Sequence, residues 1–436
     1  MPVNTSDLLF DREVVTELSQ KNNEPAWMLE RRLQALELAS ELPLPKPDKT
    51  SIRFWNLTKF APYTAETVVS EFAQLPEAIR TFVGREEGVR NLVVQHHSSV
   101  VYSELAPEVA AQGVILTDLH SALTEHGALM QKYFMSEAVR ADEHRLTALH
   151  GALWSGGVFL YVPKNVEVSL PIQSLFWTDR PGVGVLPHVL IVAEANSKVT
   201  FVDNYLGDDE VSDVVHNGVT EIFAGDGAHV QYATLHHYGA GVRDVSYRRA
   251  VVGRDAHVEW ILGELNNGDT ISDNDSLLAG QGSSSVVKTL AVGSGKQTSN
   301  MTSRIRHEGK HSESNILARV VMKDEATGIV NSVTKIEKGA SKSDGEQTGR
   351  VLMLDEKARG DANPILLIEE NDVIAGHAAS AGQIDPLQIY YLMSRGISKA
   401  DAERLIVYGF LNPLLAEIPI PGVIDHLQRV IERKLR

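Results

Sequence analysis

The hydrophobic positions between residues 151 and 385 fall in short, strand-like runs separated by Gly, Asn and Asp. One unit recurs in HVLIVAEANSKVTFVDNYLG, TEIFAGDGAHVQYATLHHYG and RAVVGRDAHVEWILGELNNG. Each copy has an apolar run, a small or polar turn, and then a Val followed two places later by an aromatic residue. The pairs are Val199 and Phe201, Val230 and Tyr232, and Val258 and Trp260. A period of two puts both members of a pair on one face of a strand.

The three valines are 31 and 28 residues apart, which is typical of a repeat protein. A single copy of short strands cannot bury its own hydrophobic faces, so neighbouring copies must stack on one another. Because no helical segment interrupts the repeats, the sequence predicts a mainly β protein with a parallel β-helix core. A β-sandwich is the competing all-β fold, but it gives no reason for a nearly constant coil length.

Helical patterns flank this core. In NNEPAWMLERRLQALELASELPLPKP, apolar residues recur near helical spacing, Pro25 fits the first helical position, and Pro43 ends the helix. Segments such as VRNLVVQ and SSVVYSEL, further along, are typical of strands. We therefore expect a mixed, partly helical N-terminal domain over residues 1–150 and the β-helix over residues 151–385.

Residues 386–436 are expected to form a C-terminal helical domain. Ser398 is the predicted N-cap of one helix, with an acidic residue three places later, and Asn412-Pro413 is predicted to end it. One apolar stripe is expected along that helix at Ala402, Leu405, Ile406, Gly409 and Phe410. The segment IPIPG then separates a final helix, which carries Ile424, Leu427, Ile431 and Leu435.

Composition and charge exclude several classes of protein. The chain of 436 residues has 41 Lys and Arg against 57 Asp and Glu, a net charge of −16, so nucleic-acid binding is not expected. It contains no cysteine, which excludes disulfides, thiolate zinc sites and a persulfide carried by this chain. The start, MPVNTSDLLFDREVV, lacks the features of a signal peptide, and no apolar stretch is long enough to cross a bilayer. We expect a cytoplasmic protein without a membrane contact.

Two short motifs resemble binding sites, but the sequence around them favours structural roles. GSGKQT, at residues 293–298, lacks the first glycine and the final Ser or Thr of a phosphate-binding loop. His307 and His311 are four residues apart, as on a metal-binding helix, but the composition of RHEGKHSES is typical of a strand and a turn. An extended strand would separate the two side chains by roughly 13 Å.

The remaining histidines and carboxylates give weaker signals. The pairs His96-His97 and His236-His237 are each expected to point to opposite faces of a strand, so that neither pair makes a site alone. Each of three residues, Lys198, His229 and His257, precedes the Val of its repeat, which predicts an outward, solvated ladder. Asp273 and Asp275 in ISDNDS would suit acid–base chemistry, but the composition of this segment favours a loop.

His377 stands among small residues in AGHAASAGQIDPLQIYYLMSRGI. An imidazole is a suitable ligand for iron, and a lone histidine is enough when other ligands come from a second chain. The alternative is a histidine that is hydrogen-bonded within the last coil. Glu369, Glu370 and Asp372 lie nearby in sequence, and for them an acidic surface is the favoured interpretation.

Several long segments together resemble one family. They are EPAWMLERRLQALEL, VNSVTKIEKGASKSDGEQTGRVLMLDEKARGDANPILLIEENDV, AGHAASAGQID and IYYLMSRGISKADAERLIVYGFL. In this order they are similar to the SufB/SufD family of iron–sulfur cluster assembly scaffolds, and most similar to its SufD members. Ala358 stands where the SufB members carry a functional cysteine. The resemblance implies a right-handed parallel β-helix and a non-enzymatic scaffold.

The resemblance also implies partners. It predicts a complex with a SufB-like subunit and a SufC-like ABC ATPase, with a homodimer as an open possibility, and a transient iron or iron–sulfur cluster shared across the interface. It implies that His377 faces the SufB-like subunit as a cluster ligand. The ATPase is expected on the C-terminal helices, at Tyr390, Tyr391, Leu392, Arg395, Gly396, Ile397, Leu405, Ile406 and Phe410. Binding of reduced flavin is left open, and a β-helix carbohydrate-active enzyme is the alternative from a different class.

Overall fold

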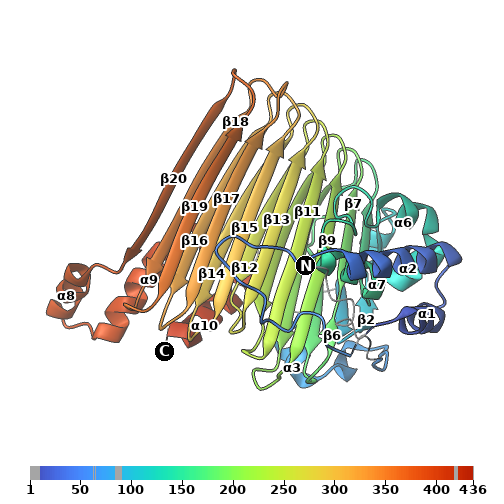
Figure 1. Ribbon diagram of the computed structural model, residues 1–436, viewed down its shortest axis with the longest axis horizontal. Helices are drawn as coiled ribbons and strands as arrows, with labels where there is room; N and C mark the ends of the chain where they lie inside the picture. The colour runs from blue at the N-terminus through green and yellow to red at the C-terminus, as the bar shows by residue number, and fades with distance from the viewer. Residues whose placement is uncertain (1–9, 62, 64, 84–90, 417–420, 436) are drawn as a thin grey trace.

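A two-sheet parallel β-solenoid forms the centre of the molecule, as the repeats predict (Figure 1). The computed structural model describes residues 10–61, 63, 65–83, 91–416 and 421–435. The strands of the solenoid are β4 (Gly157–Val162), β5 (Ile172–Thr178), β6 (Gly184–Val185), β7 (His188–Ala193), β8 (Lys198–Gly207), β9 (Val214–Ala224), β10 (His229–His237), β11 (Val242–Val252), β12 (His257–Glu264), β13 (Thr270–Leu278), β14 (Ser284–Gly293), β15 (Thr298–His307), β16 (Glu313–Met322), β17 (Thr327–Ile336), β18 (Asp344–Met353), β19 (Arg359–Ile368) and β20 (Ile374–Gln383).

Successive strands alternate between two sheets. One sheet has the order β2-β1-β5-β8-β10-β12-β14-β16-β18-β20, and the other has the order β19-β17-β15-β13-β11-β9-β7-β4-β3, with β6 beside β9. The pairs from β5 and β4 onward are parallel. At the N-terminal end, β1 (Leu92–His96) pairs antiparallel with β2 (Ser99–Glu104), and β3 (Ile115–Asp118) pairs antiparallel with β4. Two short antiparallel pairs therefore terminate the sheets at this end.

The predicted ladder of valines and aromatic residues lines the core. The three valines are directly opposite one another in the strand register, and so are the three aromatic residues. The rings of Phe201 and Tyr232 have centroids 5.9 Å apart, and those of Tyr232 and Trp260 are 5.1 Å apart. The indole N–H of Trp260 donates to Ser276 at 2.9 Å, so its polar group is satisfied although it is buried.

The turns between coils stack as closely as the strands. A Cβ atom on Gly309 would lie 1.9 Å from the carbonyl oxygen of Gly280, and one on Gly280 would lie 2.1 Å from the backbone nitrogen of Arg254. No side chain fits at either position, which explains these glycines. Asn196 and Asp255 occupy other turns with φ of 55° and 54°, a left-handed conformation that Asn and Asp tolerate.

The N-terminal region continues the sheets and packs helices against them. Strands β1 and β2 lie where the segments VRNLVVQ and SSVVYSEL predict them, and residues 89 and 90 of the first segment lie outside the described residues. The helices are α1 (Arg12–Lys21), α2 (Ala26–Glu41), η2 (Phe72–Gln74), α3 (Glu77–Val83), α4 (Pro107–Ala110), α5 (Leu119–Glu125), α6 (Gly127–Tyr133) and α7 (Arg145–Leu153). The domain boundary expected at residue 150 falls inside α7.

Helix α2 is anchored by a buried ion pair. Pro25 is its N-cap and not, as predicted, its first residue. Arg32 is fully buried and donates to Glu24 at 2.6 and 2.7 Å and to the carbonyl of Trp154 at 3.1 Å. Burial alone would raise the pKa of Glu24, but Arg32 and His120 lower it to about 2. Because both charges are paired, the guanidinium ties α2 to the end of α7.

The C-terminal region consists of α8 (Pro386–Ser394), α9 (Lys399–Leu415) and α10 (Pro421–Leu435). Ser398 caps α9 as predicted, with its hydroxyl accepting from the N–H of Asp401 at 3.2 Å. The predicted end at Asn412-Pro413 is wrong, because α9 continues to Leu415. Pro413 lies in the last turn, where it removes only a single helical hydrogen bond.

The predicted apolar stripe of α9 is also wrong in its orientation. Ala402, which belongs to the predicted stripe, is buried, and the side chains that pack on the sheet are Val407, Leu411, Leu414 and Leu415. Of the predicted stripe, Leu405 and Gly409 are exposed, and Ile406 and Phe410 are half-buried. The helix has apolar residues on more than one face, and contact with the sheet selects which face is buried.

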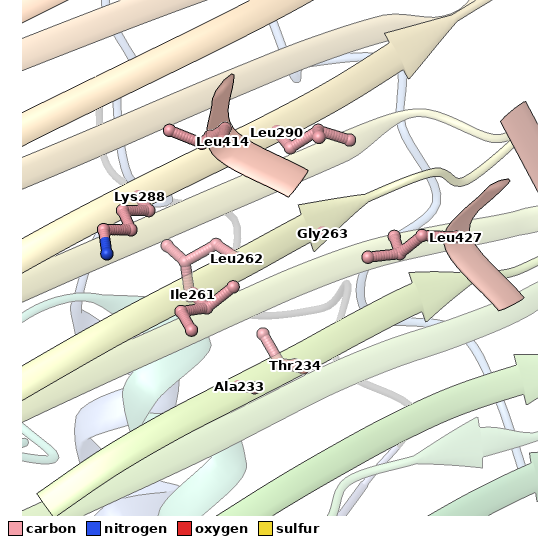
Figure 2. A pocket seen from close by; sticks show the side chains of 9 residues that line it. All are labelled: Ala233, Thr234, Ile261, Leu262, Gly263, Lys288, Leu290, Leu414 and Leu427. Carbon is pink, nitrogen blue, oxygen red and sulfur yellow. The ribbon is translucent and has the colours of Figure 1, made fainter. Parts of the chain in front are cut away.

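Helices α9 and α10 lie against β10, β12 and β14, and Figure 2 shows Leu414 and Leu427, their side chains at this contact. Leu414 of α9 and Leu427 of α10 point toward Ile261 and Leu290 of the sheet. The gap left between these side chains is small and apolar, and the ammonium group at its edge, on Lys288, binds Glu259 at 2.6 Å. This is a packing contact, which fixes α9 and α10 on the solenoid.

We expect Trp260→Ala to lower the free energy of unfolding by about 3–5 kcal/mol, because the change leaves a cavity beside Tyr232. Urea denaturation followed by circular dichroism measures this loss. The matched control is His229→Ala, an exposed position on β10, for which a change within about 0.5 kcal/mol is expected. Equal losses in the two variants would contradict a core built on the aromatic ladder.

Candidate functional site at the open end of the solenoid

The C-terminal end of the solenoid is uncovered. Strands β19 and β20 are the last strands of their sheets, and their outer edges pair with no other strand of the described chain. Eight of the ten residues of β20 are exposed, whereas eight of the ten residues of β17 are buried. Unpaired N–H and C=O groups along such an edge are available for pairing with another chain.

The two edge strands differ in composition. Strand β20 (IAGHAASAGQ) presents small side chains, which make a flat surface. Strand β19 contains Pro364, which pairs with Ser332 of β17 and cannot donate a backbone hydrogen bond. At the turn between them, Leu367, Ile368 and Ile374 are exposed apolar side chains. This end therefore combines free backbone groups with an apolar corner, as a surface for a protein partner does.

His377 lies on β20, opposite Gln347 of β18, and its side chain is exposed. Within the described residues, it makes no side-chain hydrogen bond that would support the alternative of a structural histidine. A Cβ atom on Gly376 would lie 2.8 Å from both carboxylate oxygens of Glu346, so the glycine makes room for this neighbour. Because side chains alternate along a strand, Glu346 and His377 lie on opposite faces of the sheet, and the imidazole alone is the iron ligand that β20 offers.

The acidic residues near His377 in sequence have a structural environment. The Glu370 carboxylate accepts hydrogen bonds from the N–H groups of Gly339 at 2.9 Å and Asn371 at 2.8 Å. These bonds lower the pKa of Glu370 and fix the turn between β19 and β20. The geometry is that of a turn at the surface, in line with the interpretation favoured by the sequence.

Helix α8 projects beyond the solenoid at the same end of the molecule (Figure 1). Tyr390 and Tyr391 are 71% and 58% exposed, and Ile389 is the only buried residue of this helix. The guanidinium group of Arg395 lies over the ring of Tyr391, 5.3 Å from its centroid. Of the predicted partner residues, the exposed ones are Tyr390, Tyr391, Arg395, Gly396 and Leu405, and the half-buried ones are Leu392, Ile397, Ile406 and Phe410.

The other sequence candidates have structural roles. His307 is buried and bonds to the hydroxyl groups of Ser312 and Ser314, both at 2.8 Å, while His311 is an exposed turn residue. The loop containing Lys296 joins two strands, β14 and β15, so no helix follows it. Lys198, His229 and His257 are in register, as predicted.

Asp273 and Asp275 lie in strand β13, so the prediction of a loop is wrong. The arginines of neighbouring coils explain this placement. Arg249 lies 2.8 Å from Asp273, and Arg304 lies 3.4 Å from Asp275. Because both carboxylates are held in ion pairs, this face does not offer the free carboxylate pair that a carbohydrate-active enzyme would need.

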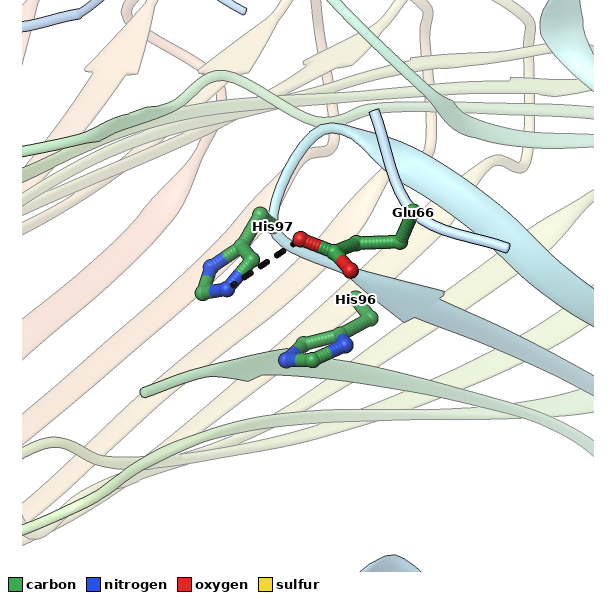
Figure 3. Close-up of side chains that lie close together, drawn as sticks. All are labelled: Glu66, His96 and His97. Atoms are coloured by element: carbon green, nitrogen blue, oxygen red, sulfur yellow. Dashed lines mark ion pairs between the residues drawn. The ribbon is translucent and has the colours of Figure 1, made fainter. Parts of the chain in front are cut away.

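The prediction for His96 and His97 is also wrong. The two rings do not point to opposite faces but stack, with centroids 4.2 Å apart. The cause is the backbone of His97, which leaves the strand with a φ of 50° and so breaks the alternation of side chains. Figure 3 shows both imidazoles close to the carboxylate of Glu66. His236 and His237 do differ as predicted, since His236 is buried in the core and His237 lines a surface cavity.

Sequence reasoning missed a buried group inside the solenoid. His216 and His236 contact the two carboxylate oxygens of Asp244 through their Nδ1 atoms, at 2.6 and 2.7 Å. Burial raises the pKa of Asp244, but the two imidazoles lower it well below its usual value. Three such side chains have the spacing of metal ligands. However, the guanidinium of Arg248 donates to Nε2 of His236 at 2.6 Å, and this cation disfavours a metal ion at the same place.

A second buried chain of polar groups joins α7 to the solenoid. His150 bonds through Nδ1 to the carbonyl of Asn217 at 2.9 Å and through Nε2 to His188 at 3.0 Å. His188 in turn lies 3.0 Å from Glu221. A carbonyl only accepts, so Nδ1 of His150 must carry the proton, and each neutral ring then accepts at its Nε2. Glu221 therefore completes the chain as a protonated carboxyl group that donates to His188.

The pKa shifts agree with this direction of hydrogen-bond donation, from Glu221 to His188 and from His188 to His150. Burial raises the pKa of Glu221 to about 8 and lowers the pKa of His188 to about 3, so all three groups are neutral near pH 7. The N–H groups of Met135 and Val139 also donate to Glu221, at 2.7 and 3.0 Å. The signal in the sequence is a pair of polar residues inside apolar runs, PHVLIV and TEIFA, but their partners are distant in the chain.

We expect Glu221 to make stability fall as pH rises from about 4.5 toward 8. Its pKa is raised on folding, so its contribution is complete below the unfolded value and is lost as the folded carboxyl group ionises. The difference in unfolding free energy between the parent protein and Glu221→Gln should change by about 1.4 kcal/mol per pH unit in this range. Urea denaturation of both proteins at several pH values measures it. A difference that does not vary with pH would contradict a protonated Glu221.

Comparisons with known proteins identify the family of the chain. Residues 176–410 match the family model described as "SUF system FeS cluster assembly, SufBD core domain", and residues 21–174 match "SufBD protein N-terminal region". The chain is 49% identical over 431 residues to "Iron-sulfur cluster assembly protein SufD" of Bacillus subtilis, covering 98% of this chain and 99% of that protein. It is 29% identical to an "Iron-sulfur cluster assembly SufBD family protein" of Staphylococcus epidermidis, covering 96% and 91% of the two chains. The chain therefore belongs to the SufBD family of the SUF iron–sulfur cluster assembly system.

Proposed function

We propose that this chain is a SufD-like scaffold subunit that has no catalytic activity of its own and acts in the cytoplasm. It pairs through its open end with a SufB-like subunit and carries a SufC-like ABC ATPase on its C-terminal helices. The observation that supports this most strongly is the uncovered last coil, because a solenoid end with two unpaired edges suits a related solenoid as its partner. In the described residues, no helix is long and apolar enough to cross a membrane.

The lack of cysteine assigns the chain a supporting role at the cluster. Thiolates are the usual ligands of iron–sulfur clusters, and this chain has none. Its own contribution is the exposed imidazole of His377 on the edge strand β20. The sulfur ligands must come from the partner, so the cluster is built at the interface and is a cargo shared by two subunits.

The partner ATPase supplies the energy for conformational changes of the complex. Tyr390, Tyr391 and Leu405 offer exposed apolar and aromatic surface, and Arg395 is held over Tyr391. Aromatic residues and arginine are common where few residues carry most of the binding energy of an interface. Because α9 and α10 are packed on β10, β12 and β14, a movement imposed on these helices would reach the solenoid directly.

We expect the double change Tyr390→Ala and Tyr391→Ala to weaken binding of the ATPase subunit by about 10–100-fold, the range for loss of an interface hot spot. Isothermal titration with the purified ATPase subunit measures this. Phe54→Ala is the matched control, since Phe54 is 89% exposed and lies far from α8 in the chain. An unchanged affinity in the α8 variant would place the ATPase elsewhere.

We expect His377→Ala to leave the complex intact but to reduce cluster assembly by about tenfold, because one ligand of the shared site is lost. Anaerobic reconstitution of the complex, followed by the visible absorption of the cluster, measures this. His311→Ala, another exposed histidine, is the control. Normal assembly in the His377 variant would contradict a ligand role for this residue.

The first experiment is an anaerobic pull-down of the tagged full-length chain with identification of the co-purifying proteins. Recovery of a cysteine-bearing relative and an ABC ATPase would support the heteromeric scaffold. Recovery of a self-paired chain alone would favour a homodimeric scaffold, and a free monomer would contradict the proposal.

A further inference from the structure

Two histidines and two carboxylates converge at the opposite end of the sheet from His377. His96 is the last residue of β1 and His97 forms the turn that follows it. Asp179 follows the end of β5, and Glu66 comes from a segment that lies beside β2, where its N–H donates to the hydroxyl of Ser99 at 3.2 Å. Three separate parts of the chain thus supply side chains to one place, shown in Figure 3 for the two histidines and Glu66.

The distances suit a single ion. One ligand atom from each of Glu66, His96 and His97 can be chosen so that all lie within 4.8 Å of one another. The Oδ1 atom of Asp179 lies 3.0 Å from Nε2 of His96 and 3.0 Å from Nε2 of His97. Ligands at roughly 2.0–2.1 Å from a tetrahedral ion are about 3.3 Å apart, so small shifts would bring these atoms to bonding distance.

The environment of His97 suits a metal ligand. Its side chain is fully buried, and its Nε2 atom points at the carboxylates but makes no hydrogen bond. Nδ1 of His97 bonds to the hydroxyl of Thr178 at 3.2 Å, and when Nδ1 is the donor, Nε2 presents a lone pair toward Asp179, as a metal ligand does.

Neighbouring groups hold the other ligands in place. The indole N–H of Trp177 donates to Oδ2 of Asp179 at 3.2 Å, which turns Oδ1 toward both imidazoles. Thr178 plays the same part for His97. Ligands of bound metals are commonly oriented by hydrogen bonds of this kind.

From this geometry we propose that His96, His97, Asp179 and Glu66 form a binding site for one divalent transition-metal ion, of the class of ferrous iron or zinc. Two imidazoles with carboxylates favour these ions over magnesium or calcium, which prefer oxygen ligands alone. Arg180 pairs with Oε1 of Glu66 at 3.0 Å, and the same oxygen lies 3.8 Å from Nε2 of His97, so Glu66 would be the outermost of the four ligands. Glu66 also lines a surface cavity with Ser98 and Ser99, which gives an ion a path to the site.

This site does not depend on the proposed partner surface. Eight strand-to-strand steps separate β1 from β20 in their common sheet, a distance of about 38 Å at 4.8 Å per step. The metal site therefore is not part of the cluster interface, and the two proposals can fail separately.

The test is an anaerobic titration of the chelator-treated full-length chain with Fe²⁺ and, in a separate experiment, with Zn²⁺, in competition with a chromophoric chelator. One equivalent should bind to the parent protein. His96→Ala and Asp179→Asn should each weaken binding by at least about tenfold, whereas His377→Ala should leave it unchanged. Added Zn²⁺ should also raise the melting temperature of the parent more than that of His96→Ala.

Partial exposure of His96 and Asp179, at 16% and 40%, makes both variants suitable for this comparison, and circular dichroism of the metal-free proteins verifies their fold. Co²⁺ provides an independent readout, because its visible absorption reports nitrogen and oxygen coordination and should disappear in both variants. Equal binding by the parent and the two variants would overturn the proposal. So would the absence of a tightly bound equivalent of either ion in the parent.

Discussion

Parallel strands in this protein obtain their hydrogen bonds only from the coils before and after them, and the rest of the structure follows from this. The register between coils puts like residues on top of one another, which builds the ladder of Phe201, Tyr232 and Trp260. The same spacing forces the turns so close together that Gly280 and Gly309 admit no side chain. It also means that the last coil has no source of hydrogen bonds for one edge of each strand.

The parts of the fold that repeat along the chain were predictable from the sequence. The interval between Val199, Val230 and Val258 is visible without knowledge of any contact, and it fixes both the strand direction and the inward face. The cap at Ser398 was predictable for the same reason, because its bond to Asp401 is local. Helix α9 shows the limit, since a helix with two apolar stripes does not indicate which one meets the sheet.

The polar groups of the core and of the candidate sites were not predictable, because their partners lie far away in the chain. Glu221 and His188 belong to different coils, and Arg32 reaches the end of α7 across more than a hundred residues. The stacking of His96 and His97 was missed for a local reason. Period-two alternation holds only while the backbone stays extended, and His97 leaves that region. For His377, the sequence motif gave the residue, whereas its exposure on an edge strand required the structure.

The two ends of the solenoid are not equivalent, and this limits how copies can assemble. The N-terminal end closes with the antiparallel pairs β1–β2 and β3–β4, while the C-terminal end stays open. Head-to-tail stacking, which would give an unlimited fibre, needs a surface at each end of a copy that binds the opposite end of the next copy. If only the C-terminal end binds another copy or a relative, growth stops after one joining event, so assembly through this end is limited to a pair.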